Sequence, residues 1–148
     1  MKKAPILIIG LGNPLMGDDG IGCVVAERLA AGSGLPDGVE VLCGGTDLLA
    51  WAAQMEGRSR VIIVDAMEGS PGAITVWKDR FEQLDDRQEH AHHLSVVQSL
   101  HLMQRSVAAR FTLVGIGIVS ARAGDGVSDR LAARVPAITA RVMQELNC

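Results

Sequence analysis

Short apolar runs alternate with longer amphipathic segments along this chain, and the alternation predicts strands followed by helices. The apolar runs are rich in β-branched residues, which is typical of strands buried in a parallel sheet. We expect such strands at residues 6–10, 39–43, 60–64, 73–78 and 111–118. Apolar residues recur every three or four positions between them, so we expect helices at 21–31, 46–55, 93–105 and 131–146, the last broken before Pro136.

The order of these elements favours an α/β fold with a parallel or mostly parallel sheet that is covered by helices on both faces. No repeat, low-complexity tract or linker divides the sequence, so we expect a single domain over residues 1–148. Sheets of this kind place their sites at the carboxyl ends of the strands, where the strand order switches. The loops after Gly10, Cys43, Val64 and Ile118 are therefore the segments in which to search for a site.

The composition argues against several classes of protein. With 148 residues, 48% of them apolar, and a net charge of −3, the chain matches a water-soluble domain without the basic patch of a nucleic-acid-binding protein. The apolar run near the N-terminus spans about five residues, too short for a signal sequence or a membrane span, so we expect a cytoplasmic location and no membrane partner. The three cysteines are scattered and form no C-x-x-C pair, which predicts reduced, mostly buried thiols.

The loop after the first predicted strand, GLGNPLMGDDGIG at residues 10–22, is the most informative segment. Its position is that of a phosphate-binding loop, but its sequence fits poorly. A dinucleotide-binding motif needs a third glycine where Leu15 stands, and a P-loop needs Lys and Ser/Thr where Asp18 and Asp19 stand. Two carboxylates at that place repel phosphate, so nucleotide or phosphate binding is disfavoured.

Two interpretations remain for this pair of aspartates. One aspartate can cap the following helix, since carboxylates stabilise a helix N-terminus by about 0.5–1 kcal/mol. A second aspartate among five glycines suggests more, because that many glycines cost backbone entropy without a gain in packing. In the first interpretation both aspartates are structural. In the second, Asp18 is the cap and Asp19 is a metal ligand that faces the cleft. The sequence supports the two interpretations about equally.

Further candidate ligands follow later in the sequence. Asp65 comes directly after the run RVIIV, at the carboxyl edge of the predicted sheet, although it could also cap a turn. His90, His92 and His93 lie close together, and we expect one of them to be a ligand, since two carboxylates and an imidazole make a workable divalent site. Neither G-x-S-x-G nor H-E-x-x-H is present, so a hydrolase with this sequence favours metal-activated water over a side-chain nucleophile.

These motifs, in this order, resemble those of the hydrogenase maturation endopeptidases over nearly the whole chain. GLGNPLMGDDGIG is similar to the first signature of that family, and it is followed by GGT at 44–46, VDA at 64–66, a histidine two residues before Leu94, the run FTLVGI and a last helix that contains proline. The resemblance implies a three-layer α/β/α sandwich around a twisted, mostly parallel five-stranded sheet. It also implies an endopeptidase that removes the C-terminal extension of a nickel-loaded NiFe-hydrogenase large-subunit precursor.

The resemblance further implies that Asp19, Asp65 and His92 contact nickel and are the catalytic residues. The precursor would supply this nickel as the recognition element, rather than the free enzyme, which we expect to be a monomer. His90 stands where family members often carry serine, so His90 and His93 stay alternatives to His92. Cleavage could follow from polarisation of the scissile carbonyl at the nickel or from Asp19 as general base.

Two other functions stay open beside the endopeptidase. One is a non-catalytic metal-binding α/β domain that uses the same cleft. The other is the phosphate- or nucleotide-binding domain that Asp18 and Asp19 disfavour. Cleavage of a nickel-loaded precursor separates the endopeptidase from both.

Overall fold

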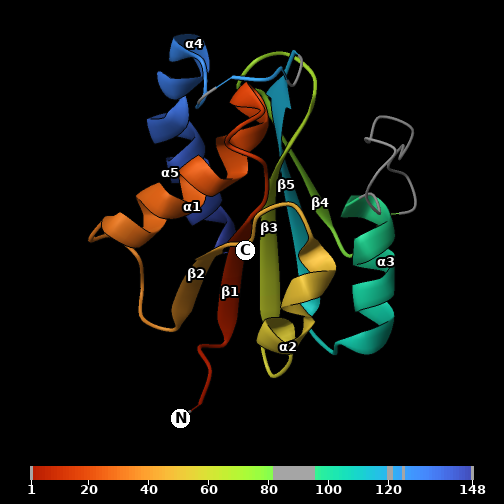
Figure 1. Ribbon diagram of the computed structural model, residues 1–148. Coiled ribbons are helices and arrows are strands. Elements are labelled where there is room, and N and C mark those ends of the chain that lie inside the picture. Colours follow the sequence, from red (N-terminus) through yellow and green to blue (C-terminus); the bar gives the residue numbers. More distant parts are fainter. Residues whose placement is uncertain (1, 82–95, 120–121, 125, 148) are drawn as a thin grey trace.

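The computed structural model describes residues 2–81, 96–119, 122–124 and 126–147, which form a five-stranded sheet with helices on both faces (Figure 1). The strands are β1 (Ile6–Gly10), β2 (Val39–Cys43), β3 (Arg60–Glu68), β4 (Ile74–Lys78) and β5 (Arg110–Ile118). The α-helices are α1 (Ile21–Ala31), α2 (Ala52–Met55), α3 (Val96–Ser106), α4 (Asp129–Ala132) and α5 (Val135–Glu145). Two short 3-10 helices, η1 (Gly17–Gly20) and η2 (Leu48–Trp51), precede α1 and α2.

The sheet has the order β2-β1-β3-β5-β4. Every neighbouring pair is parallel except β4 and β5, which are antiparallel, so the mostly parallel five-stranded sheet is confirmed. From β1 the chain goes outward to β2 and then returns to the other side of β1 for β3. The strand order therefore switches between β1 and β3, and the carboxyl ends of these two strands flank the place where open α/β sheets bind ligands.

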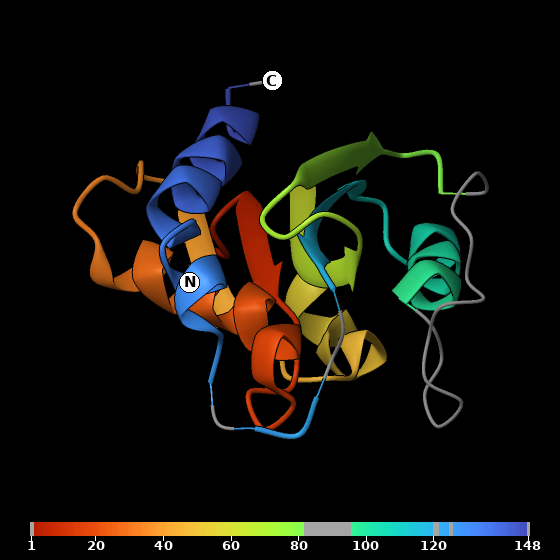
Figure 2. The same cartoon turned by 90° about the horizontal axis from the view of Figure 1, so that it is seen from above.

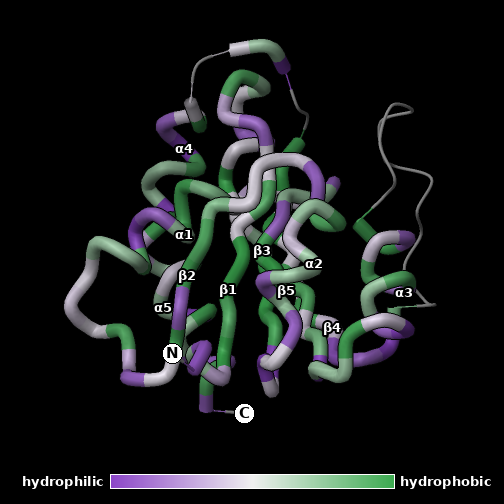
Figure 3. Tube along the Cα trace, turned by 60° about the horizontal axis from the view of Figure 1, so that its bottom comes forward, coloured by the Kyte–Doolittle hydropathy of each residue, from purple (hydrophilic) through white to green (hydrophobic). Residues whose placement is uncertain are grey.

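Two apolar clusters hold the helices to the sheet, one on each face. Figure 2 shows α1 and α5 on one side of the sheet and α2 and α3 on the other. Neighbouring residues of a strand point to opposite faces, so Ile8 packs into the cluster with α1, α4 and α5, and Ile9 packs into the cluster with η2, α2 and α3. Both faces of β1 and of residues 61–64 of β3 are thus buried, which explains why these stretches are apolar (Figure 3).

α1 begins in direct backbone contact with the sheet. A Cβ atom on Gly22 would lie within 3.0 Å of the carbonyl oxygens of Leu11 and Val64, closer than real Cβ atoms come to other heavy atoms. The N–H of Leu11 donates to the same Val64 carbonyl at 2.8 Å. Glycine at position 22 therefore lets the helix begin against the carboxyl ends of β1 and β3.

The structure corrects two expected element boundaries. β3 does not end at Val64 but continues to Glu68, because β5 pairs with it as far as Ile118. The segment expected as one helix at 46–55 is divided into η2 and the single turn α2, and the Asp47 side chain caps η2 by accepting from the N–H of Leu49 at 3.1 Å.

The remaining helix expectations agree with the structure where it describes them. The break before Pro136 is confirmed, since α4 ends at Ala132 and the proline lies in the first turn of α5. The expected start of α3 at residues 93–95 lies outside the described residues. Within the described ranges, none of the helices combines the length and apolar character that crossing a bilayer needs.

The contact at Gly22 gives a test of the packing. Gly22→Ala should lower the free energy of unfolding by about 2–3 kcal/mol, because the new methyl group meets backbone atoms that cannot move aside alone. Gly34→Ala is the matched control, since a Cβ atom there has nothing within 4 Å. It should change stability by less than about 0.5 kcal/mol. Denaturant unfolding measures both variants, and equal effects would contradict the close contact.

Candidate active site

The loop between β1 and α1 uses its backbone N–H groups within the protein. Gly12 N–H donates to Gly45 at 2.7 Å, and Gly17 N–H donates to Gly124 at 3.1 Å. Other donors of the loop bond inside it: Asn13 N–H to Asp19 Oδ2, Leu15 N–H to Asn13 Oδ1, and the N–H groups of Met16 and Asp19 to carbonyls of the loop. A phosphate loop instead directs such donors at its ligand, so this geometry weighs against the nucleotide-binding alternative.

Gly12 brings the two ends of the loop together. Its φ is 142°, and a Cβ atom there would lie within 3.0 Å of the Asp19 carbonyl oxygen. A side chain at this position would therefore push the backbone of Asp19 away. The glycine sets how closely Asp19 approaches the end of β1.

Asp19 has one carboxylate oxygen held by a backbone N–H and one without a donor among the described residues. Oδ2 accepts the N–H of Asn13 at 2.9 Å, whereas Oδ1 accepts no hydrogen bond within the described part of the chain. The side chain is half-buried. An oriented carboxylate with one oxygen left for another partner has the form expected of a metal ligand or a general base.

The expectation that Asp18 caps α1 is wrong. The N-cap of α1 is Gly20, which has no side chain to form a cap, and Asp18 lies in the first turn of η1, ahead of the helix. The Asp18 carboxylate instead reaches α4: Oδ1 accepts the backbone N–H of Ser128 at 2.6 Å, and Oδ2 accepts the Ser128 hydroxyl at 3.2 Å. Asp18 and Asp19 thus have different partners, although they are neighbours in the sequence.

Asp65 lies on the other side of the switch in strand order. It lies within β3 opposite Gly115, one residue beyond the last β1–β3 pair, which is Gly10 with Val64. Its Oδ1 accepts the N–H of Ala66 at 2.8 Å. η1, which carries Asp19, contacts β3, which carries Asp65. Both aspartates therefore belong to the same edge of the sheet.

The predicted imidazole ligand is not part of the described structure. His92 and its alternatives His90 and His93 all lie between residues 82 and 95, outside the described residues. Among the residues that the structure does describe, no three His, Cys, Asp or Glu side chains form a group able to hold a metal ion. The assignment of His92 stays a prediction.

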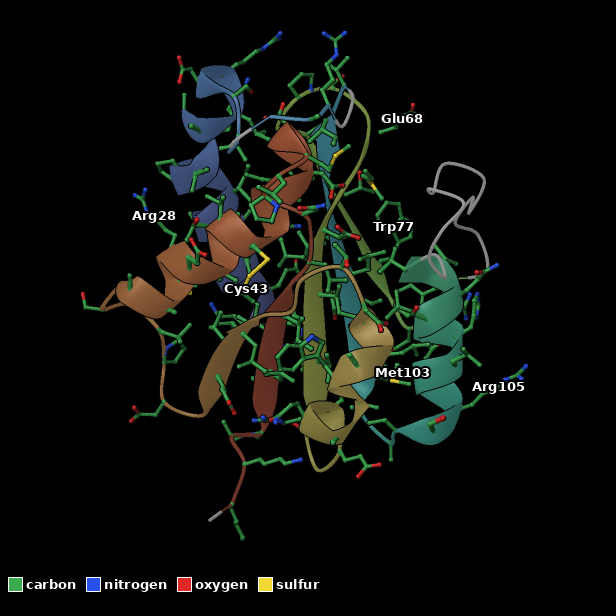
Figure 4. The ribbon with its side chains drawn as sticks, viewed as in Figure 1. Arg28, Cys43, Glu68, Trp77, Met103 and Arg105 are labelled. Carbon is green, nitrogen blue, oxygen red and sulfur yellow. A yellow bond between two sulfur atoms is a disulfide. The ribbon has the colours of Figure 1, made fainter. Side chains whose placement is uncertain are left out.

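Cys23 and Cys43 form a disulfide, so the expectation of reduced thiols is wrong for this pair. Their Cα atoms lie 5.1 Å apart, within the usual span of such bonds. Figure 4 shows the bond beside Cys43, where the end of β2 meets α1. Sequence spacing alone did not reveal it, because the two cysteines are separated by 20 positions and only the parallel β1–β2 pair brings them together. The bond joins the first turn of α1, which follows the acidic loop, to the strand that leads into Gly44.

Sequence reasoning also missed the residues at 122–124 and 126–128, which lie against the acidic loop. Gly124 N–H donates to Leu15 at 3.0 Å, and Gly126 N–H donates to Pro14 at 3.1 Å. Ser128 then binds Asp18 across a separation of 110 residues. Nothing in the sequence pattern points to this contact, because glycine and serine in a loop are compatible with many partners.

Comparison with known proteins decides the family. A family model described as hydrogenase maturation protease matches residues 23–145. The chain belongs to the hydrogenase maturation protease family. The matched range begins after the loop at 10–22, so this assignment and the geometry of the acidic loop are separate observations.

Individual relatives agree with this assignment. The chain is 32% identical over 117 residues to the hydrogenase 2 maturation protease of Escherichia coli, a match that covers 75% of this chain and 71% of that one. A Methanocaldococcus jannaschii relative is 42% identical over 78 residues, so the aligned part spans half the length of that protein. The solved structure of the hydrogenase maturating endopeptidase HybD from E. coli superposes with a TM-score of 0.77 at 27% identity, over 99% of this chain and 93% of that chain. The resemblance inferred from the motifs is confirmed, and the family places the chain among the peptidases.

Counting thiols tests the bond between Cys23 and Cys43. Alkylation of the denatured protein without reductant should modify only Cys148, one of the three cysteines, and all three after reduction. Cys43→Ser should lower the free energy of unfolding by about 3 kcal/mol, since the bond closes a loop of about 20 residues. Cys148→Ser is the control, and it should leave no thiol before reduction. Three modified cysteines in the unreduced protein would show that the bond is absent.

Proposed function

We propose that this chain removes the C-terminal extension of a NiFe-hydrogenase large-subunit precursor that already carries nickel. The family and the names of the E. coli relatives support the class of reaction and of substrate. The structural observation that supports the proposal concerns the Asp19 carboxylate. One of its oxygens accepts the N–H of Asn13, which orients the group, and the other oxygen accepts nothing from the described residues. The proposal treats residues 1–148 as one maturation-protease domain, acting in the cytoplasm as a monomer.

The proposed contact with nickel uses Asp19, Asp65 and His92. The two carboxylates would approach the metal from opposite sides of the strand-order switch, one from η1 and one from β3. Imidazole is a common nickel ligand, and His92 would supply it. Because the precursor brings the nickel, these residues would recognise a loaded substrate and place its scissile bond at the acidic loop.

Asp19 is also the group best placed to move a proton. Hydrolysis requires water to attack the scissile carbonyl carbon, the C–N bond to break, and a proton to reach the departing amine nitrogen. A carboxylate with one oxygen fixed by a backbone N–H can accept the proton from water and return it to the amine. Nickel, when present, would add charge stabilisation at the carbonyl oxygen.

The alternative functions differ in their support. Phosphate or nucleotide binding loses support, because the loop donors are used internally and Asp18 and Asp19 lie where a phosphate loop carries Lys and Ser/Thr. A non-catalytic metal-binding protein would use the same aspartates, so the distinction between it and the proposed peptidase depends on whether a peptide bond is cleaved.

Cleavage of a precursor tests the proposal. The protein should shorten a nickel-loaded large-subunit precursor and leave the nickel-free form intact, as seen by the mass of the product. Asp19→Asn should reduce the rate by at least about 1000-fold, because the amide is neutral and cannot serve as a base. Asp129→Asn, which changes an exposed aspartate in the first turn of α4, is the matched control and should cleave normally.

Three results would overturn the proposal. Trimming of both precursor forms would show that recognition does not need nickel. Trimming of neither form by a folded sample would show that the protein lacks the proposed activity. Normal trimming by Asp19→Asn would remove Asp19 from the site while leaving the family assignment untouched.

A further inference from the structure

We infer that Asp18 and Ser128 form a positioning pair that orients Asp19, and that Asp18 contributes as a hydrogen-bond acceptor rather than as a metal ligand or a base. This inference rests on the proposed function, because it gives Asp19 a role in cleavage. It concerns two residues that contact each other across 110 positions of sequence.

The contact uses both oxygens of the Asp18 carboxylate. Oδ1 accepts the Ser128 N–H at 2.6 Å, and Oδ2 accepts the Ser128 hydroxyl at 3.2 Å. The same Ser128 oxygen accepts the N–H of Leu131 at 3.3 Å and so caps α4. Asp18 is therefore tied to the start of α4, and with both oxygens occupied it is poorly suited to ligate a metal ion.

The geometry of η1 carries this constraint to Asp19. A 3-10 helix has about three residues per turn, so neighbouring side chains point about 120° apart around its axis. Fixing Asp18 against α4 therefore fixes the rotation of η1, and Asp19 is held facing away from α4. Figure 1 shows α4 and the start of α1 at the same end of the sheet.

Backbone contacts hold the rest of the loop but leave this rotation to the side chains. Met16 forms a β-bridge with Gly124, and Gly17 N–H bonds to the Gly124 carbonyl at 3.1 Å. These bonds lie at the N-terminal end of η1, whereas Asn13 holds only one oxygen of Asp19, near the other end. Without the Asp18–Ser128 pair, the face of η1 toward α4 loses its side-chain attachment, and the direction of the Asp19 carboxylate is held less firmly.

A neutral amide should serve almost as well as the carboxylate at position 18. In Asp18→Asn the amide oxygen can still accept the Ser128 N–H, and the amide nitrogen can donate to the Ser128 hydroxyl oxygen. In Asp18→Ala both bonds are lost. A metal ligand or base would not tolerate the amide, so the two substitutions separate a positioning role from a chemical one.

The experiment measures kcat/KM on the nickel-loaded precursor. Asp18→Ala should lower kcat/KM by about 10- to 100-fold, as expected for a displaced catalytic group. Asp18→Asn should stay within about threefold of the unaltered protein. Ser128→Ala keeps the backbone bond and should lose less than Asp18→Ala. The double variant should be no worse than Asp18→Ala, since the bond to Asp18 that Ser128→Ala removes is one of the two already lost in Asp18→Ala. Asp129→Ala is the control that changes a carboxylate beside Ser128 without touching the pair.

Amide hydrogen exchange supplies a readout that needs no precursor. Exchange of the Asn13 amide, which donates to Asp19 Oδ2, should speed up in Asp18→Ala and remain slow in Asp18→Asn, while the amides of β1 and β3 stay protected in both. If the unaltered protein trims no precursor, the proposed function fails, and exchange still tests the pair.

Three results would each overturn the inference. They are a loss of activity in Asp18→Asn as complete as in Asp19→Asn, full activity in Asp18→Ala, and additive effects in the double variant. If Asp18→Ala proves too unstable to assay, Asp18→Asn and Ser128→Ala decide it by the same criteria.

Discussion

Backbone contact between the first turn of α1 and the ends of β1 and β3 is the constraint on which the site depends. Gly22 lies directly against the carbonyls of Leu11 and Val64, so the helix can begin immediately beside the sheet. The loop that joins β1 to α1 must therefore make a tight closed path over the strand-order switch, and Gly12 allows its two ends to meet. The backbone of Asp19 lies where it does because that path has little room to vary.

The sheet could be predicted from the sequence because its strands are marked by local composition. Strands buried on both faces must be apolar throughout, and runs such as the one that begins at Ile6 satisfy this rule without reference to any distant residue. The end of β3 could not be predicted in the same way. The strand continues past Val64 because β5 is paired beside it, and pairing partners are set by topology rather than by local pattern.

The candidate site could be predicted only in part, for the same reason. The acidic loop was visible as a motif, and the strand-order rule placed Asp65 near it. The expectation that Asp18 caps α1 was wrong, because both aspartates are carboxylates before a helix and nothing local shows which partner each one has. The structure separates them by their partners, Ser128 for one and Asn13 for the other, and the first of these is remote in sequence. The partnership of Cys23 with Cys43 was hidden likewise.

The internal hydrogen bonding of the acidic loop bears on how binding energy is used. A loop whose donors already have partners keeps its shape before any substrate arrives, so docking a precursor costs it little conformational entropy. Under the proposed function, the ordering cost would then fall on the tail of the precursor, which must be held in one conformation for cleavage. Discrimination between precursors would accordingly depend on how easily each tail adopts the bound shape, with the protease acting as a rigid template.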